Sequence, residues 1–172
     1  MRSALFPIAL ILVVVLVILD GAQGFVRGGG AGDMPEQPQP DQCDPNWQTL
    51  NVQLKRNRAA WNQYSKSMKC YTMVFARQCF CPPEWRGPFD ATVDGRVVYP
   101  KRFSIPTMDE IFDMVQERCI DGCPKRGAVL CNVKFASEDE GSYIKSLYID
   151  QIKQIADEEI GYTIDDLKPC VE

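Results

Sequence analysis

The sequence predicts an exported α+β domain of two layers, in which a largely antiparallel sheet of four to six strands packs against two helices and is stapled by disulfides. Three observations predict this class. They are an apolar N-terminal segment, eight cysteines that all follow it, and a chain order of helix, strand, hairpin, helix and two or three further strands. Helices segregated from a largely antiparallel sheet form a two-layer α+β fold.

Residues 1–24 have the pattern of a signal peptide. Arg2 precedes an unbroken apolar run over 5–19, and Ala22-Gln23-Gly24 is a small-x-small cleavage site. The run is shorter than the roughly 20 residues that a transmembrane helix needs, although an uncleaved signal-anchor stays the alternative. We therefore expect a secreted protein without membrane association after cleavage.

Residues 25–42 are expected to be a flexible leader, and 43–172 a single domain. The leader combines a glycine run with spaced prolines and few apolar side chains, so it buries too little surface to offset ordering entropy. From Thr107 onward, 15 acidic residues stand against 7 basic ones. This excess of negative charge argues against nucleic acid as a partner.

The domain is expected to open with a long amphipathic helix. Asp44 suits the N-cap of this helix, and Pro45 suits its first position. Apolar side chains then recur at steps of three and four residues, as on one buried helix face. They are Trp47, Leu50, Leu54, Trp61, Tyr64 and Met68.

A strand and a hairpin are expected next. Residues 70–81 are rich in the β-branched and aromatic side chains that favour a strand. Asp94-Gly95 stands between two apolar stretches within 88–103, and this dipeptide is the strongest short hairpin signal in the chain.

The second helix is expected to begin at Thr107, because Thr107 and Glu110 have the spacing of a capping box. Two strands are predicted over 127–135 and 142–150, with an acidic turn between them. Residues 159–167 are predicted to form a last strand or an extended arm. The apolar face of the second helix is Met108, Ile111, Phe112, Val115 and Cys119.

The cysteines predict a disulfide framework, because an even number of them in an exported chain is typical of structural bridges. Eight cysteines allow 105 pairings, so the sequence leaves the connectivity open. The candidates are Cys43, Cys70, Cys79, Cys81, Cys119, Cys123, Cys131 and Cys170.

Cys79 and Cys81 form a special pair, one residue apart and directly before Pro82-Pro83. In a regular strand such residues lie about 6.5–7 Å apart, whereas a disulfide needs Cβ atoms within roughly 3.5–4.5 Å. They can bond to each other only if the chain bends at the prolines. A bent bridge would favour redox chemistry, and two thiols could hold a soft metal such as Cu(I). The main expectation is that both cysteines belong to structural bridges.

The chain contains no histidine. This removes the commonest general base, the Ser-His-Asp and Cys-His pairs and the usual ligands of catalytic zinc. We therefore expect neither an enzyme nor a cofactor. A glycosidase that uses only carboxylates stays as a third hypothesis, and the same acids could hold calcium. These acids are Glu138-Asp139-Glu140, Asp157-Glu158-Glu159 and Asp165-Asp166.

Several stretches together resemble a family known as domain of unknown function 6174. They are Trp61 with Tyr64, "CFCPPEWRGPFDATVDGRVV", "PTMDEIFDMV", "VKF" with "GSYIKSLYID", and "ADEEIGYTIDDLKP", over roughly residues 55–169. The resemblance implies a small exported or lipid-anchored domain, and it carries no activity or ligand. The family pattern centres on Cys79 and Cys81, and the other six cysteines are additional here. The resemblance therefore favours a bent bridge between these two.

These features predict a non-catalytic module that binds an extracellular protein or surface. The alternative is a thiol redox or soft-metal-binding protein that uses Cys79 and Cys81. Neither nucleic acid nor, after signal cleavage, the membrane is an expected partner.

Overall fold

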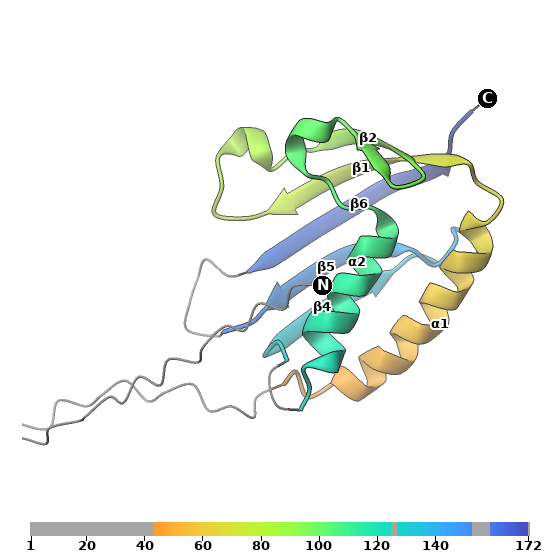
Figure 1. Cartoon of the computed structure of the whole chain (residues 1–172). Coiled ribbons are helices and arrows are strands. Elements are labelled where there is room, and N and C mark those ends of the chain that lie inside the picture. The colour runs from red at the N-terminus through yellow and green to blue at the C-terminus, as the bar shows by residue number, and fades with distance from the viewer. Residues whose placement is uncertain (1–42, 125–126, 153–158, 172) are drawn as a thin grey trace, which may run out of the picture. The chain divides into compact units, whose positions relative to one another are not determined.

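Six strands form one sheet, in which every neighbouring pair is antiparallel. They are β1 (Cys70–Gln78), β2 (Phe89–Asp94), β3 (Val97–Tyr99), β4 (Leu130–Phe135), β5 (Ile144–Asp150) and β6 (Ile160–Pro169). Their order across the sheet is β3-β2-β1-β6-β5-β4. A computed structural model describes residues 43–124, 127–152 and 159–171 (Figure 1). The predicted signal peptide and leader, 1–42, lie outside the described residues.

Two helices cover one face of this sheet, α1 (Trp47–Ser65) and α2 (Met108–Val115) (Figure 1). The second continues into a π-helical segment, η3 (Gln116–Asp121). Two short 3₁₀ helices, η1 (Pro83–Trp85) and η2 (Lys101–Phe103), flank the hairpin of β2 and β3. The predicted two-layer α+β class is therefore confirmed. No helix among the described residues is long and apolar enough to cross a membrane.

The core lies between the helices and the sheet. The ring of Trp61 in α1 meets Tyr71 of β1 edge-on, with centroids 5.5 Å apart, and its Nε1 donates to Asp109 Oδ1 in α2 (3.1 Å). Phe112 of α2 stacks on Phe135 of β4 at 6.4 Å. Because Trp61 is fully buried, truncating it to alanine is expected to cost about 3–5 kcal/mol.

The first helix begins later than predicted. Its N-cap is Asn46, so the prediction of Asp44 was wrong, and the first helical residue is Trp47 rather than Pro45. Asp44 is 3% exposed, and its carboxylate accepts hydrogen bonds from the N–H groups of Asn46 (2.7 Å) and Cys131 (2.8 Å). A buried carboxylate needs such donors. This one finds them in β4 as well as at the helix start.

Two local predictions are confirmed. The Thr107 hydroxyl accepts from the Glu110 N–H (3.2 Å), and Glu110 Oε2 accepts from the Thr107 N–H (2.7 Å), which completes the capping box. Asp94 and Gly95 make the turn between β2 and β3, and Gly95 has a φ of +58°, which glycine adopts without steric cost. Both structures are determined by residues close together in sequence, so tertiary contacts do not alter them.

The segment predicted as a last strand or arm is β6, and it occupies the centre of the sheet. Phe75 of β1 faces Ile164, and Leu147 of β5 faces Tyr162. The register with β1 shifts near Met73, where β6 has an extra residue and bulges. The last strand is therefore the connection between the two halves of the sheet.

All eight cysteines are paired. Three bonds span 80, 100 and 12 positions of sequence and join different elements, whereas the fourth spans 2. The pairs are Cys43–Cys123, Cys70–Cys170, Cys119–Cys131 and Cys79–Cys81.

Candidate functional site

The Cys79–Cys81 disulfide lies in a turn directly after β1. This strand ends at Gln78, three residues earlier than predicted. The two Cα atoms are 5.2 Å apart, closer than the roughly 6.5–7 Å of an extended strand. The chain thus bends where the prolines follow, and the two cysteines bond to each other instead of reaching other elements.

Hydrogen bonds hold this turn independently of the disulfide. The Arg77 N–H donates to the Arg86 carbonyl oxygen (2.8 Å), and the Trp85 N–H donates to that of Pro82 (2.9 Å). The Arg86 guanidinium Nε donates to the Cys81 carbonyl oxygen (3.0 Å). The residues after the disulfide therefore fold back onto the end of β1.

The Cys79–Cys81 bond contributes little to stability. In the chain-entropy model a bridge that closes about 100 residues stabilises the fold by about 4.7 kcal/mol, whereas one that closes three residues contributes about 1.6 kcal/mol. Cys70–Cys170, which spans 100 positions, is of the first kind. The short bridge joins residues that the chain already holds close together, so stability alone does not account for it.

Aromatic side chains are exposed in the disulfide turn and in the segments that follow it along the chain. Phe80, between the two cysteines, is 89% exposed, and Trp85 and Tyr99 are 40% and 50% exposed. Trp85 packs edge-on against Phe103 at 6.0 Å, and Phe103 stacks on Phe89 at 4.0 Å. We call these five residues the aromatic end. Its inner rings are supported by η2 and β2, while its outer rings face solvent.

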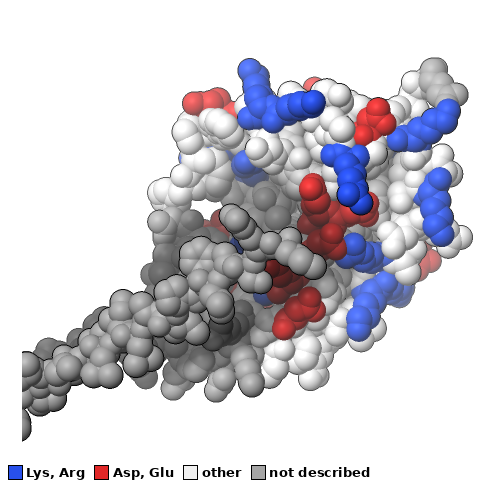
Figure 2. Space-filling view, in the orientation of Figure 1, with Lys and Arg blue, Asp and Glu red and all other residues white. Residues whose placement is uncertain are grey.

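Basic side chains accompany the aromatic end. The Arg102 guanidinium lies 4.4 Å from the Phe103 ring centroid, and Lys101 Nζ lies 5.5 Å from that of Tyr99. Figure 2 shows Lys and Arg side chains over η2, and acidic side chains along α2 in the middle of the same face. Within the described ranges, the ion pairs involve neither these two residues nor Arg86. Their charges are therefore available to a ligand.

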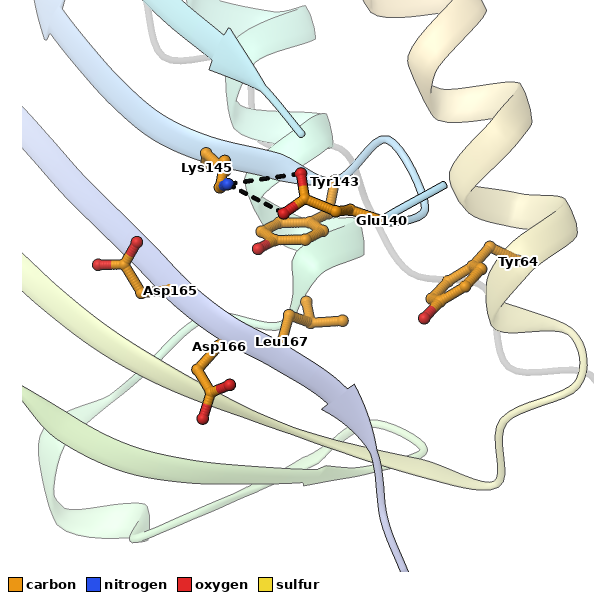
Figure 3. Close-up of a pocket in the computed structure, with 7 residues that line it drawn as sticks. All are labelled: Tyr64, Glu140, Tyr143, Lys145, Asp165, Asp166 and Leu167. Atoms are coloured by element: carbon orange, nitrogen blue, oxygen red, sulfur yellow. Dashed lines mark hydrogen bonds and ion pairs between the residues drawn. The ribbon is translucent and has the colours of Figure 1, made fainter. Parts of the chain in front are cut away.

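A separate cleft of about 340 Å³ lies beside β5 and β6 (Figure 3). Lys145 Nζ approaches Glu140 Oε1 within 3.1 Å. Hydrogen bonds from Ser137, and then from Lys145, lower the pKa of the Glu140 carboxyl, while Glu140 raises the pKa of Lys145. The two charges offset each other. The cleft is lined by Tyr64, Glu140, Tyr143, Lys145, Asp165, Asp166 and Leu167.

The acidic residues of the glycosidase hypothesis do not all lie at one site. Glu138 pairs with Arg56 of α1, whereas Glu140 and Asp165-Asp166 line the cleft. Asp157-Glu158 lie outside the described residues. A catalytic carboxylic acid needs a raised pKa, and the pKa of Glu140 is lowered instead. Glu140 is therefore held as a charged carboxylate, which does not suit a general acid.

Sequence reasoning singled out Cys79 and Cys81 but gave no role to Phe80, Trp85 or Tyr99. One signal was present. A phenylalanine between two cysteines and before two prolines cannot follow the alternation of a half-buried strand once the chain bends. The exposure of Tyr99 depends on the register in which β3 pairs with β2. The sequence does not reveal this register.

Fold and site together define a small disulfide-rich α+β domain with an exposed aromatic end. Residues 53–169 match the family of unknown function DUF6174, so the chain belongs to that family, as its sequence resemblance predicted. Cys43 and Cys170 lie outside the matching range, so two of the four disulfides reach beyond it. The comparisons with curated proteins and with solved structures find no match.

Proposed function

We propose that this domain is a non-catalytic module that binds an extracellular protein through the aromatic end. The observation that carries the proposal is the exposure of Phe80, which is 89% in a turn closed by a disulfide. A ring on a short closed turn has little backbone freedom left to lose. Preorganisation of this kind lowers the entropic cost of binding.

The residue types at this surface support a protein partner. Aromatic side chains and arginine are enriched among the residues that dominate binding energy at protein interfaces. Phe80, Trp85 and Tyr99 expose apolar rings, and Arg86 and Arg102 lie in the same segments.

Two observations support the absence of catalysis. The chain has no histidine, and the pKa of Glu140 in the cleft is lowered rather than raised. General acid catalysis by a carboxyl group needs the opposite shift.

Secretion belongs to the same proposal. Four disulfides tie the domain, and such bridges persist in oxidising compartments outside the cytoplasm. Recovery of the chain from the culture medium of producing cells is the expected result.

Site-specific photo-crosslinking tests the binding surface. A benzophenone amino acid replaces Phe80 in one variant, and in a matched control it replaces Val52, which is 70% exposed on α1. In native medium, we expect a protein adduct from position 80 alone, suppressed by excess unlabelled protein but not by a Trp85→Ala, Tyr99→Ala variant. Equal adducts from both positions, or turnover of a substrate without any adduct, would contradict the proposal.

The alternative function, a thiol redox or soft-metal protein, has one specific observation in its favour: Cys79 and Cys81 bond to each other. Soft-metal binding needs two thiolates, so it applies only to the reduced pair. Among the described residues, no group of three or more Cys, His, Asp or Glu could hold a metal ion. Redox chemistry of the pair is compatible with binding at the aromatic end.

A further inference from the structure

We infer that Cys79–Cys81 is the one reactive disulfide of the domain, and that it exchanges with a partner dithiol. This inference does not rest on the proposed binding function. It assigns a covalent, stoichiometric reaction to this disulfide. The other three disulfides are structural and do not undergo the reaction.

The four bridges differ in their position in the domain. Cys119 is fully buried, and a Cβ atom on Gly127 would collide with the sulfurs of Cys43 and Cys123. Cys119 is thus inaccessible, and Cys43 and Cys123 leave no room for a side chain at position 127. Cys79 and Cys81 are half-buried like Cys43 and Cys123, but they flank an exposed residue in a turn beyond the last residue of β1.

The fourth bridge, Cys70–Cys170, is only partly buried, but the sheet holds its two ends together. The Cys170 N–H donates to the Cys70 carbonyl oxygen (3.1 Å), and the neighbouring Tyr71 pairs with Pro169. The bond spans 100 positions of sequence, so its loss would remove a large constraint on the unfolded chain. This bridge is therefore a structural one.

The domain keeps its fold when Cys79–Cys81 opens. The hydrogen bonds of Arg77 with Arg86 and of Trp85 with Pro82 fix the turn without the disulfide. The bond spans only 2 positions of sequence, and a loop that short has the smallest closure entropy. Oxidised and reduced forms are therefore both folded, which a reversible couple requires.

A positive charge lies close to the backbone of Cys81. Arg86 Nε donates to the Cys81 carbonyl oxygen (3.0 Å), which fixes the guanidinium at the backbone of Cys81. A neighbouring cation stabilises a thiolate and makes it a better leaving group. We therefore place the attack at Cys79 and the departure at Cys81.

The reaction balances as follows. A thiolate of the partner dithiol attacks Cys79 Sγ and forms a mixed disulfide, while the bond to Cys81 breaks and leaves a Cys81 thiolate. The second partner thiolate then attacks the partner sulfur of the mixed disulfide and releases the Cys79 thiolate. Two electrons pass from the partner, which becomes a disulfide, to Cys79 and Cys81. The two protons lost by the partner thiols are taken up by these thiolates.

Graded reduction of the full chain with dithiothreitol, itself a dithiol, tests the inference. Newly formed thiols are alkylated at each concentration and located by peptide mass spectrometry. We expect Cys79 and Cys81 to be labelled at a concentration at least about ten-fold below that needed for any other cysteine. Earlier or simultaneous labelling of another pair overturns the inference.

A matched pair of variants tests the role of the guanidinium. Arg86→Gln is expected to slow opening of the Cys79–Cys81 bond by about three-fold or more. The control Arg96→Gln, in the turn between β2 and β3, is expected to leave the rate unchanged. Equal rates in both variants reject the assignment of Cys81 as leaving group.

A third variant separates this inference from the binding function. Phe80→Ala removes the exposed ring and is expected to leave the order of reduction unchanged. If Phe80→Ala no longer binds the protein partner but its disulfides are reduced in the same order, the result supports both the binding function and the reactivity of Cys79–Cys81. If the order changes in this variant, the reactivity comes from the ring and not from the disulfide, which contradicts the inference.

Discussion

The Tyr71 hydroxyl connects the sheet to the start of the second helix. It accepts a hydrogen bond from the Met108 N–H (2.9 Å), and burial raises the pKa of Tyr71 to about 12. The first N–H groups of a helix have no partner within the helix. One of the groups that α2 leaves unpaired is thus satisfied from β1.

Tyr71→Phe is expected to lower the free energy of unfolding by about 1–3 kcal/mol, because the buried Met108 N–H loses its acceptor. Urea denaturation at neutral pH measures the change. Tyr99→Phe is the matched control, since Tyr99 is half exposed, and its unfolding free energy is expected to stay unchanged.

The pH dependence of this variant follows from the raised pKa. The folded state keeps Tyr71 neutral, so its contribution is fully present below the ordinary tyrosine pKa of 10.0, which the unfolded chain has, and is lost as pH rises through about 12. Between about pH 8 and pH 11, the wild type should lose about 1.4 kcal/mol that Tyr71→Phe does not lose. If the difference in unfolding free energy between wild type and Tyr71→Phe stays constant over this pH range, the pKa of Tyr71 is not raised by burial.

Phe80→Ala is expected to leave the free energy of unfolding within about 0.5 kcal/mol of wild type, because the exposed ring makes little contribution to the core. Phe75→Ala, five residues earlier in β1 and fully buried, should cost about 3–5 kcal/mol. Urea denaturation compares the two. A large loss at Phe80 would mean that the ring serves the fold rather than a partner.

At the scale of elements, the disulfides differ in what they hold. The double variant Cys70→Ala, Cys170→Ala separates the start of β1 from the end of β6 and should cost up to about 4.7 kcal/mol. The double variant Cys79→Ser, Cys81→Ser should cost about 1.6 kcal/mol or less. Denaturant midpoints measured for both double variants compare the two losses of stability. A larger loss in the Cys79→Ser, Cys81→Ser variant would contradict this prediction.

Elements set by neighbouring residues could be predicted from the sequence. The capping box of Thr107 and Glu110 and the turn at Asp94-Gly95 are of this kind. Asp44 is also a residue type that favours the N-cap position. Its carboxylate, however, accepts a hydrogen bond from the Cys131 N–H of β4, which is distant in sequence. A tertiary contact thus moved the helix start.

The candidate site was predictable only in part, for the same reason. Cys79 and Cys81 stand out in the sequence, and their spacing limits their geometry to two cases. The exposure of Tyr99 and the support of Trp85 by Phe103 arise where the chain returns through η2. Such contacts between residues far apart in sequence carry no local pattern.

At the scale of the whole molecule, β6 joins two groups of strands that are each local in sequence. The first group is β1 to β3, and the second is β4 with β5. A chain that ends at residue 152 lacks β6 and is expected to show no cooperative urea transition, because the first group loses its central neighbour. Circular dichroism during the titration tests this. A chain that ends at residue 169 is the control and should unfold cooperatively, although it lacks Cys170.

The central position of β6 also determines when the domain can form during synthesis. The ribosome makes this strand after the other five, so the two strand groups remain separate until β6 has emerged. Pairing between segments far apart in sequence is slow in any case. The core of the domain therefore closes only after β6 has been made.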